Sequence, residues 1–277
     1  MILNFNMEIN ERSKCNYTKK IMYDITACIV TYNTKIDELK KAIFSFLNTD
    51  LKVRLYISDN SPSDKLKEII QEFNDDRIEY FFNNCNGGYG WGQNKVIEKI
   101  KNNSKYHIIL NPDIYFEKGV LEKLFNYMEQ HKEIGHIMPM VKYPNGDTQY
   151  LCKRFPRVRD LFLRRFCPIK SIVEKNDNYY EMRDTGYNKI MEVPLLSGCF
   201  MFLRTDIFVK VNGFDERFFM YMEDFDLCRR IGEISKVVFY PETEIVHNHA
   251  RESHKNLKMT LEHIKSAIKY FIKWRGK

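Results

Sequence analysis

Residues 25–31 read Ile25-Thr26-Ala27-Cys28-Ile29-Val30-Thr31, an apolar run rich in β-branched side chains. A helical pattern follows over residues 37–47, and the alternation of strand and helix continues to residue 110. In chains of this kind the strands pair in parallel and the helices cover both faces of the sheet. We therefore predict an α/β fold, with a Rossmann-like, mixed but mainly parallel sheet.

The remaining patterns extend this organisation along the chain. They predict strands at 25–31, 53–58, 78–82, 107–110, 134–141, 192–203 and 236–240, and helices at 37–47, 65–73, 93–100, 119–130 and 205–211. A hairpin turn is expected at residues 143–147, because Asn145-Gly146 is a strong turn signal. We expect a polar extension over 1–22, one domain over 23–250, and a basic amphipathic helix over 251–277.

Composition limits the class of protein. A chain of 277 residues with 44% apolar and 29% charged residues can bury one large core. No run reaches the roughly 18 apolar residues of a membrane helix, and the start lacks the order of a signal peptide, so we expect a cytoplasmic protein. The seven cysteines are odd in number and form no C-x-x-C pair, which argues against a disulfide framework and a zinc knuckle.

The net charge of +7 is unevenly distributed. Residues 153–175 and 251–277 each carry eight Lys or Arg against two acids, which leaves the remainder mildly acidic. Both segments interleave these charges with large apolar side chains at helical spacing, as in Val158, Leu161 and Phe162. This pattern suits an anionic lipid surface. It also suits ordinary amphipathic helices whose apolar stripe packs on the body with the lysines in water. No nucleic-acid-binding module is recognised.

Polar or glycine residues follow each of the first four predicted strands. In sheets of this class, ligands bind at the carboxyl ends of the strands. Asp59 follows the second strand, where its carboxylate could accept from a base or ribose, or could form an Asx turn. The glycines of residues 87–92 fail the G-x-G-x-x-G pattern and follow the wrong strand, and the chain has no G-x-x-x-x-G-K-[ST]. A dinucleotide-binding dehydrogenase and a P-loop nucleotidase are therefore disfavoured.

An acidic triplet, Glu223, Asp224 and Asp226, lies among apolar residues near the end of this region. Three carboxylates within four positions repel one another and resist burial, which indicates a functional site. The alternative is a solvated helix start, with the acids at the positive end of the helix dipole and Arg229 or Arg230 as ion partners.

The order of these motifs resembles glycosyltransferase family 2, the inverting enzymes of the GT-A fold. The resemblance covers residues 25–249 and rests on Ile29-Val30-Thr31-Tyr32-Asn33, Ser58-Asp59-Asn60-Ser61, Asn86-Gly87-Gly88-Tyr89-Gly90, Asn111-Pro112-Asp113, and Gly213-Phe214-Asp215-Glu216 leading into residues 223–227. It is greatest to the bacterial rhamnosyltransferase branch that builds surface polysaccharides.

The resemblance implies roles for individual residues. Asp224 would be the base that takes a proton from the acceptor hydroxyl. Beyond the resemblance, we expect Glu223 to orient the acceptor and Asp226 to form a structural ion pair with Arg229 or Arg230. Trp91 would stack on a sugar or acceptor, unless it packs beside the glycine turn. The expected donor-binding residues are Thr31, Tyr32, Asn33, Asp59, Asn60, Gly87, Gly88, Asn94, Asn111, Ser197 and Gly198.

The resemblance also implies a divalent cation, Mg²⁺ or Mn²⁺, that neutralises the departing diphosphate. Asp113 is the expected ligand, completed by His247 or His249, and imidazole suits Mn²⁺ better than Mg²⁺. The family often has an acid where this chain has Asn111, so the site offers one carboxylate fewer.

We thus expect an inverting transfer of a sugar to a hydroxyl of a lipid-linked oligosaccharide. The expected donor is dTDP-L-rhamnose, otherwise a UDP-hexose, and the expected place is the inner face of the cell membrane. A sugar nucleotidyltransferase would need an early glycine-rich loop with a catalytic Lys or Arg, which residues 31–36 lack. A non-catalytic nucleotide-sugar-binding scaffold would be expected to have lost acids that are present here.

Overall fold

The structure is a computed structural model that describes residues 22–248 and 257–276. Its strands are β1 (Tyr23–Thr31), β2 (Val53–Asp59), β3 (Ile78–Phe82), β4 (Ser104–Leu110), β5 (Ile114–Tyr115), β6 (Ile134–Lys142), β7 (Cys152–Lys153), β8 (Met191–Glu192), β9 (Leu195–Leu196), β10 (Phe200–Arg204) and β11 (Lys236–His247). Its helices are α1 (Ile36–Leu47), α2 (Leu66–Gln71), α3 (Tyr89–Asn94), α4 (Ile97–Ile100), α5 (Val120–Gln130), α6 (Val158–Phe166), α7 (Lys170–Tyr180), α8 (Thr205–Lys210), α9 (Glu223–Gly232) and α10 (Leu257–Lys273), with a 3₁₀ turn at Arg183–Thr185.

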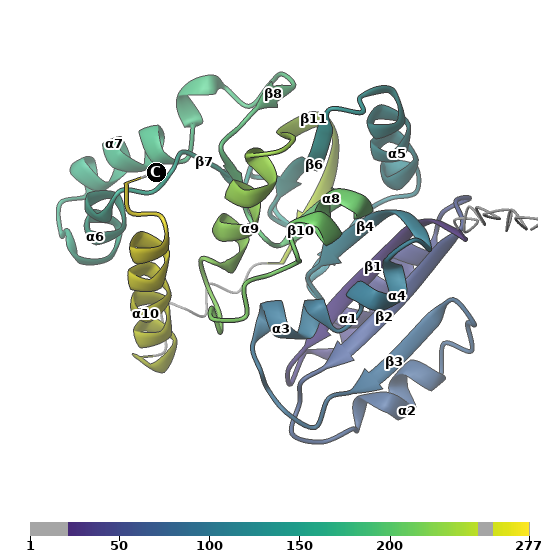
Figure 1. The fold of residues 1–277 in the computed structure, drawn as a ribbon. Helices are drawn as coiled ribbons and strands as arrows, with labels where there is room; N and C mark the ends of the chain where they lie inside the picture. Colours follow the sequence, from purple (N-terminus) through teal and green to yellow (C-terminus); the bar gives the residue numbers. More distant parts are fainter. Residues whose placement is uncertain (1–21, 249–256, 277) are drawn as a thin grey trace, which may run out of the picture.

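Nine of the eleven described strands form one sheet in the order β3-β2-β1-β4-β10-β6-β11-β5, with β8 beside β11 (Figure 1). The longest pairings are parallel: β1 with β2 and β4, and β6 with β11. Strand β10 runs antiparallel between β4 and β6. A separate small sheet pairs β7 with β9. These pairings confirm the predicted α/β fold with a mixed, mainly parallel sheet.

The core explains why the first apolar run decides the fold. Every residue of β1 from Ile25 to Thr31 is buried, so helices must cover both faces of the sheet at this strand. Helix α1 turns Leu39, Ala42, Ile43 and Phe46 inward at helical spacing. The main hydrophobic cluster runs continuously from Ile25 to Ile245.

Three predicted elements are wrong in their extent, among them the strand predicted over 236–240, which continues to His247 as β11. The strand predicted over 192–203 consists of β8, β9 and β10, which pair with different strands. Pro194 has no N–H to donate, and the chain turns again at Gly198, so no single strand can form here. The helix predicted over 93–100 begins at Tyr89 and is divided into α3 and α4.

Other predicted elements lie within a few residues of their expected places. The turn at residues 143–147 is confirmed, with Gly146 at φ +89° and a backbone bond from Tyr143 N–H to the Asp147 carbonyl at 2.8 Å. The predicted C-terminal helix is confirmed as α10, which lies beside α6 and α9 (Figure 1). Within the described ranges, no helix is long and apolar enough to cross a bilayer. The predicted extension over 1–22 falls almost wholly outside these ranges.

Candidate active site

Asp224 is held at the start of α9 by backbone N–H groups. Its Oδ2 accepts from Gly198 N–H at 2.8 Å and its Oδ1 accepts from Phe225 N–H at 2.9 Å. A Cβ on Gly198 would lie only 2.7 Å from the Cβ of Asp224, so only glycine allows this approach. The predicted donor-side residue Gly198 therefore contacts the predicted base directly.

The backbone that leads into α9 is unusual. Tyr221 and Met222 adopt φ values of +69° and +67°, a left-handed conformation that is costly for residues with a side chain. Ser266 of α10 donates its hydroxyl to the Met220 carbonyl at 2.8 Å and so braces this segment. Strain held in place by its surroundings is typical of functional sites.

The electrostatics of the first two acids favour their protonated forms. Burial and then the neighbouring Asp224 charge raise the pKa of Glu223 well above its usual range. Burial also raises the pKa of Asp224, against the bonds from Gly198 and Phe225. Within the described residues, Glu223 Oε2 is buried and has no hydrogen-bond partner. A carboxylate of raised pKa binds a proton more strongly than a solvated one, as a general base requires.

The third acid has a different environment. Asp226 is fully buried, and its carboxylate accepts from Arg230 Nε at 2.8 Å, Lys273 Nζ at 2.6 Å and Trp274 Nε1 at 3.0 Å. The predicted structural ion pair is confirmed with Arg230, whereas Arg229 stacks on Phe155 and Trp274. Asp226 thus ties α9 to α10.

Asp113 and His247 come together from opposite ends of the region. His247 pairs with Ile114 in the β5–β11 ladder, which brings its Nε2 to 3.4 Å from Asp113 Oδ2. The Asn248 N–H donates to the Asp113 carbonyl at 3.0 Å and closes the same strand end. The alternative ligand, His249, lies outside the described residues.

Gln149 fixes the orientation of His247. The amide nitrogen of Gln149 donates to the His247 carbonyl at 2.8 Å and to the Lys142 carbonyl at 3.3 Å. Its Oε1 is therefore the atom 2.9 Å from His247 Nδ1, and it accepts a hydrogen bond from the N–H at that nitrogen. This network assigns the proton of a neutral ring to Nδ1 and aims Nε2 at Asp113.

This arrangement fits a cation. A ring nitrogen and a carboxylate oxygen both present lone pairs, so a proton or a metal ion beside them is required to offset their repulsion. Burial lowers the pKa of His247, but Cys199 and Asp113 outweigh burial and raise it to about 10. The described residues contain no cluster of three or more His, Cys, Asp and Glu arranged to hold a metal. A metal here would take its other ligands from substrate phosphate and water, as Mg²⁺ commonly does.

On the β1–β2 side, Asp59 is fully buried and already bonded. Its carboxylate accepts from the Thr31 hydroxyl at 3.0 Å, the Ser61 N–H at 2.9 Å and the Tyr80 hydroxyl at 2.8 Å. The bond to Ser61 is that of an Asx turn. Asn33, at φ +49°, donates its N–H to Ser61 at 3.0 Å, and Tyr32 is exposed.

The glycine turn packs against both sides of the site. A Cβ on Gly87 would meet the Trp91 ring at 2.3 Å, and one on Gly88 would meet the Phe219 carbonyl at 2.3 Å. Asn60 donates to the Gly88 carbonyl at 3.1 Å. The Trp91 ring carries Lys95 Nζ at 3.8 Å from its centre, so the contacts of Trp91 are those of a packing residue.

Tyr89 links these parts but was not a predicted site residue, although it lies in a quoted motif. Its hydroxyl donates to Asn111 Oδ1 at 2.9 Å and lies 3.3 Å from the Gly198 carbonyl. Burial, and then Glu223, raise its pKa.

Asn94, a predicted donor-binding residue, is hydrogen-bonded to the loop before α9. Its side-chain oxygen accepts from the Phe214 N–H at 2.9 Å, and its side-chain nitrogen donates to the Phe214 carbonyl at 3.0 Å and to Glu216 at 2.8 Å.

The structure therefore gathers most predicted residues at one edge of the sheet. The tips of β1 and β2 carry the predicted nucleotide side, and the tip of β4 carries Asn111 and Asp113. The turn between β9 and β10 places Ser197 and Gly198 beside the end of β4, since Asn111 N–H donates to the Cys199 carbonyl at 2.9 Å. Asn94 and Trp91 are engaged in packing.

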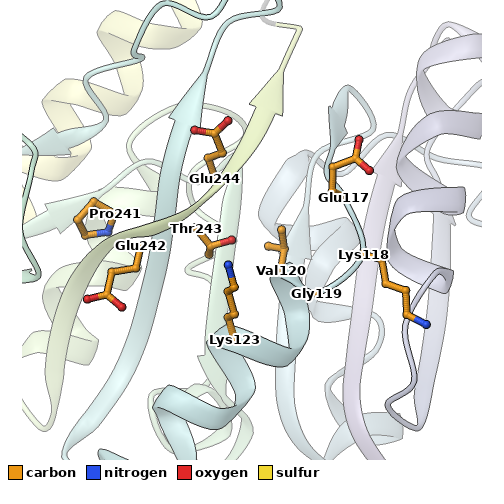
Figure 2. Close-up of a pocket in the computed structure, with 9 residues that line it drawn as sticks. All are labelled: Glu117, Lys118, Gly119, Val120, Lys123, Pro241, Glu242, Thr243 and Glu244. Atoms are coloured by element: carbon orange, nitrogen blue, oxygen red, sulfur yellow. The ribbon is translucent and has the colours of Figure 1, made fainter.

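A hollow of about 340 Å³ lies elsewhere, between the start of α5 and the bulged part of β11 (Figure 2). Its lining includes Glu117, Glu242 and Glu244 but none of the predicted site residues. Glu244 is paired with Lys142 at 3.0 Å. This acidic cluster by itself supports no ligand site.

Solved structures share the fold at low sequence identity. A structure of GalNAc-T7 with UDP, GalNAc and Mn²⁺ superimposes with a TM-score of 0.59 at 15% identity, over 82% of this chain and 43% of that one. Residues 1–349 of S. aureus TarS in complex with UDP give 0.57 at 13% identity, over 88% and 65%. This chain therefore spans less than two thirds of either, and the likeness confirms the GT-A fold.

Sequence relatives are similar over most of the chain. Rhamnosyltransferase WbbL of Escherichia coli is 27% identical over 86% of this chain and 89% of its own. N-acetylglucosaminyl-diphospho-decaprenol L-rhamnosyltransferase of Mycobacterium tuberculosis is 26% identical over 75% and 70%. Residues 26–211 match Glycosyl transferase family 2. That match covers more than half of the chain and includes the strand tips from Thr31 to Asp113, so the chain belongs to glycosyltransferase family 2 and is a glycosyltransferase.

Proposed function

We propose that this chain transfers L-rhamnose from dTDP-rhamnose, otherwise a hexose from a UDP donor, to a hydroxyl of a lipid-linked glycan. The observation that carries the proposal is Asp224, a carboxylate of raised pKa held by Gly198 N–H at the sheet edge that also holds Asp113 and His247. The names of the relatives support the sugar and the acceptor class.

Asp224 acts as the general base of an inverting displacement. Its carboxylate takes the proton of the acceptor hydroxyl while that oxygen bonds to the anomeric carbon from the face opposite the leaving group. The bond from that carbon to the diphosphate oxygen breaks, and the nucleoside diphosphate leaves with the electron pair. The raised pKa makes Asp224 a stronger base than a solvated aspartate. Glu223 Oε2 has no hydrogen-bond partner among the described residues, so it is available for a hydrogen bond with a second hydroxyl of the sugar acceptor.

Asp113 and His247 are the proposed metal ligands. A bound Mg²⁺ or Mn²⁺ would supply positive charge to the departing diphosphate. Gln149 holds the His247 ring for this role, and Asn111, bonded to Tyr89, keeps the strand end in place. The solved structure of GalNAc-T7 contains UDP and Mn²⁺, which supports divalent metal use on this fold.

The tips of β1 and β2 form the proposed nucleotide side. Asp59 uses three donors already, but its two oxygens together have about four lone pairs, which leaves room for one bond from the base or ribose. Exposed Tyr32 and the left-handed Asn33 flank this position. Asn60 and Gly88 hold the turn that covers it.

The test combines binding with turnover. Thermal unfolding is measured with dTDP, UDP and GDP, each with Mn²⁺, Mg²⁺ or EDTA, since a ligand of the native state raises Tm. We expect dTDP with Mn²⁺ to give the largest rise, and product formation from dTDP-rhamnose to stop in EDTA. Turnover unaffected by EDTA would remove Asp113 and His247 as metal ligands. A larger rise with GDP would overturn the donor assignment.

A further inference from the structure

The outer face of α10 is apolar. Leu261, Ile264, Ile268 and Ile272 are 51%, 40%, 54% and 71% exposed. Their spacing of three and four residues places them in one stripe along the helix. These four of the apolar residues at helical spacing in residues 251–277 therefore face outward, whereas ordinary amphipathic packing would bury them.

The inner face of α10 is firmly docked. Ser266, Tyr270 and Trp274 are buried one turn apart, and the last two pack with Phe218 and Met222 in a cluster of their own. Lys269 Nζ donates to the Arg217 carbonyl at 2.5 Å, and the ion pair of Lys273 with Asp226 joins the helix to α9. The exposed stripe is thus the back of a helix that is fixed to the catalytic end of the molecule.

Helix α6 extends this apolar face. Its Leu161 packs against the Tyr270 and Trp274 cluster, which places α6 beside α10 (Figure 1). Val158 and Phe162 of α6 are exposed, as are apolar side chains on and before α7. Of the fourteen large apolar side chains exposed in the described chain, ten lie within residues 155–179 and 261–272. The molecule concentrates its exposed apolar surface here.

Positive charge accompanies this apolar surface. Lys265 is exposed beside the apolar stripe of α10, where it pairs with Glu262, and Arg275 is exposed just after the helix ends. In residues 153–175, Lys153, Arg154, Arg157 and Arg164 are held in ion pairs with acidic side chains, whereas Arg159, Lys170 and Lys175 are exposed. A second copy of the chain would bring like charges together across a two-fold contact, whereas anionic lipid headgroups supply the opposite charge.

We infer that the outer faces of α10 and α6 bind the surface of an anionic lipid bilayer. The stripe of Leu261, Ile264, Ile268 and Ile272 enters the boundary between headgroups and acyl chains, and the basic side chains contact the headgroups. Because the inner face of α10 holds α9, the bilayer fixes the height of Asp224 above the membrane. The statement about Asp224 rests on the proposed function, in which the acceptor is lipid-linked. The binding of the outer faces of α10 and α6 to lipid does not depend on that function.

The experiment is sedimentation of the full chain with vesicles. We expect binding to vesicles of phosphatidylglycerol and phosphatidylcholine, and much weaker binding to phosphatidylcholine alone. Ile268→Asp combined with Ile272→Asp should weaken binding to the anionic vesicles by at least about tenfold, because charged groups enter the apolar boundary poorly. Phe44→Asp is the matched control: Phe44 is 69% exposed on α1, and its replacement should leave binding within about twofold.

Other outcomes distinguish a lipid bilayer from a second copy of the chain, and distinguish lipid binding from the proposed sugar transfer. Failure of the wild-type chain to bind anionic vesicles, or full binding by the double variant, would overturn the inference. A dimer mass in light scattering that the double variant loses would assign the stripe to a second copy instead. Vesicle binding by a chain that transfers no sugar would leave this surface standing and count against the proposed function alone. Tm of the double variant within a few degrees of wild type would show that it folds.

Discussion

At the scale of single residues, the burial of Glu223 lowers the stability of the native chain at neutral and higher pH, and its proposed role at the acceptor would explain why the residue is there. Its raised folded-state pKa means that the native chain keeps a proton which the unfolded chain loses above its ordinary value of 4.5. The stability contributed by this group therefore falls as pH rises above that value. Glu223→Gln removes the ionisation, so we expect its Tm to exceed that of wild type at pH 8 and to approach it near pH 5.

Thermal unfolding across this pH range measures the effect. A gain of about 1 kcal/mol moves the Tm of a chain of this size by roughly 2–4 °C. Glu233→Gln, at an exposed position just after the same helix, should show no such trend. A Glu223→Gln variant that melts below wild type at pH 8 would mean that the carboxylate form is stabilised by the fold.

Gln149 gives a second prediction at this scale. Gln149→Leu removes the acceptor that holds His247 Nδ1 and the two donors to backbone carbonyls. Loss of such outer partners typically weakens metal affinity by about 10–100-fold. We expect this loss in Mn²⁺ binding followed by electron paramagnetic resonance, without turnover.

The control is Gln93→Leu, which removes another buried glutamine whose amide donates to the Cys28 carbonyl at 3.3 Å. It should lose stability but keep Mn²⁺ affinity. Equal Mn²⁺ affinity in Gln149→Leu and wild type would show that His247 needs no such support, or that it is not a ligand.

The acidic and histidine side chains of the candidate site could be predicted from the sequence, whereas the residues that hydrogen-bond to site residues could not. Asp113, His247 and Asp224 follow from motif order and from the scarcity of such groups in apolar sequence. Gln149 has no local signal, because it reaches His247 only after the turn at Gly146 returns the chain to β6 and β11. Tyr89 lay inside a quoted motif, but its bond to Asn111 depends on the packing of α3 against the sheet.

At the scale of elements, the contact of α9 with α10 rests on a buried charge. Trp274→Phe keeps the ring but removes one of the three donors to the fully buried Asp226. A hydrogen bond to a charged group contributes about 1.5–3 kcal/mol, so we expect the free energy of unfolding to fall by about that amount. Urea unfolding measures it.

Arg275→Gln is the matched control, since Arg275 is exposed one residue further along. It should leave the unfolding midpoint unchanged. If Trp274→Phe also left the midpoint unchanged, Arg230 and Lys273 alone would satisfy Asp226, and the docking of α10 would rest on apolar contacts.

Elements with a strong period were predicted closely, and those that depend on tertiary pairing were not. Strand β3 was placed at its observed residues, and α1 and β2 within one residue. Strand β11 is longer than predicted, because a register shift at Tyr240 and Glu244 lets the ladder resume beyond Pro241. In α10 the period was clear but the buried face was not, because Ser266 docks through a hydrogen bond that hydropathy cannot indicate.

At the scale of the whole molecule, the proposed donor and acceptor residues occupy different parts of the sheet edge. Thr31 and Asp59 lie at the tips of β1 and β2. Asp224 lies on α9 and accepts a hydrogen bond from the Gly198 N–H, beside the end of β4. The alternation of strands and helices predicted the first part. It could not predict that β10 would enter antiparallel between β4 and β6 and bring Gly198 to the base.

This separation predicts that binding and transfer respond differently to one substitution. Asp224→Asn keeps the size of the side chain but removes the base, so we expect turnover to fall by about 10²–10⁴-fold, the usual contribution of a positioned general base. The Tm increase given by dTDP with Mn²⁺ should remain within about twofold of wild type, because no donor contact is lost.

Gly198→Ala is the matched geometric variant, since its Cβ would press on the Asp224 Cβ. It should lower turnover and keep the nucleotide response. Loss of that response in Asp224→Asn would place Asp224 on the donor side and leave the acceptor hydroxyl without its proposed base.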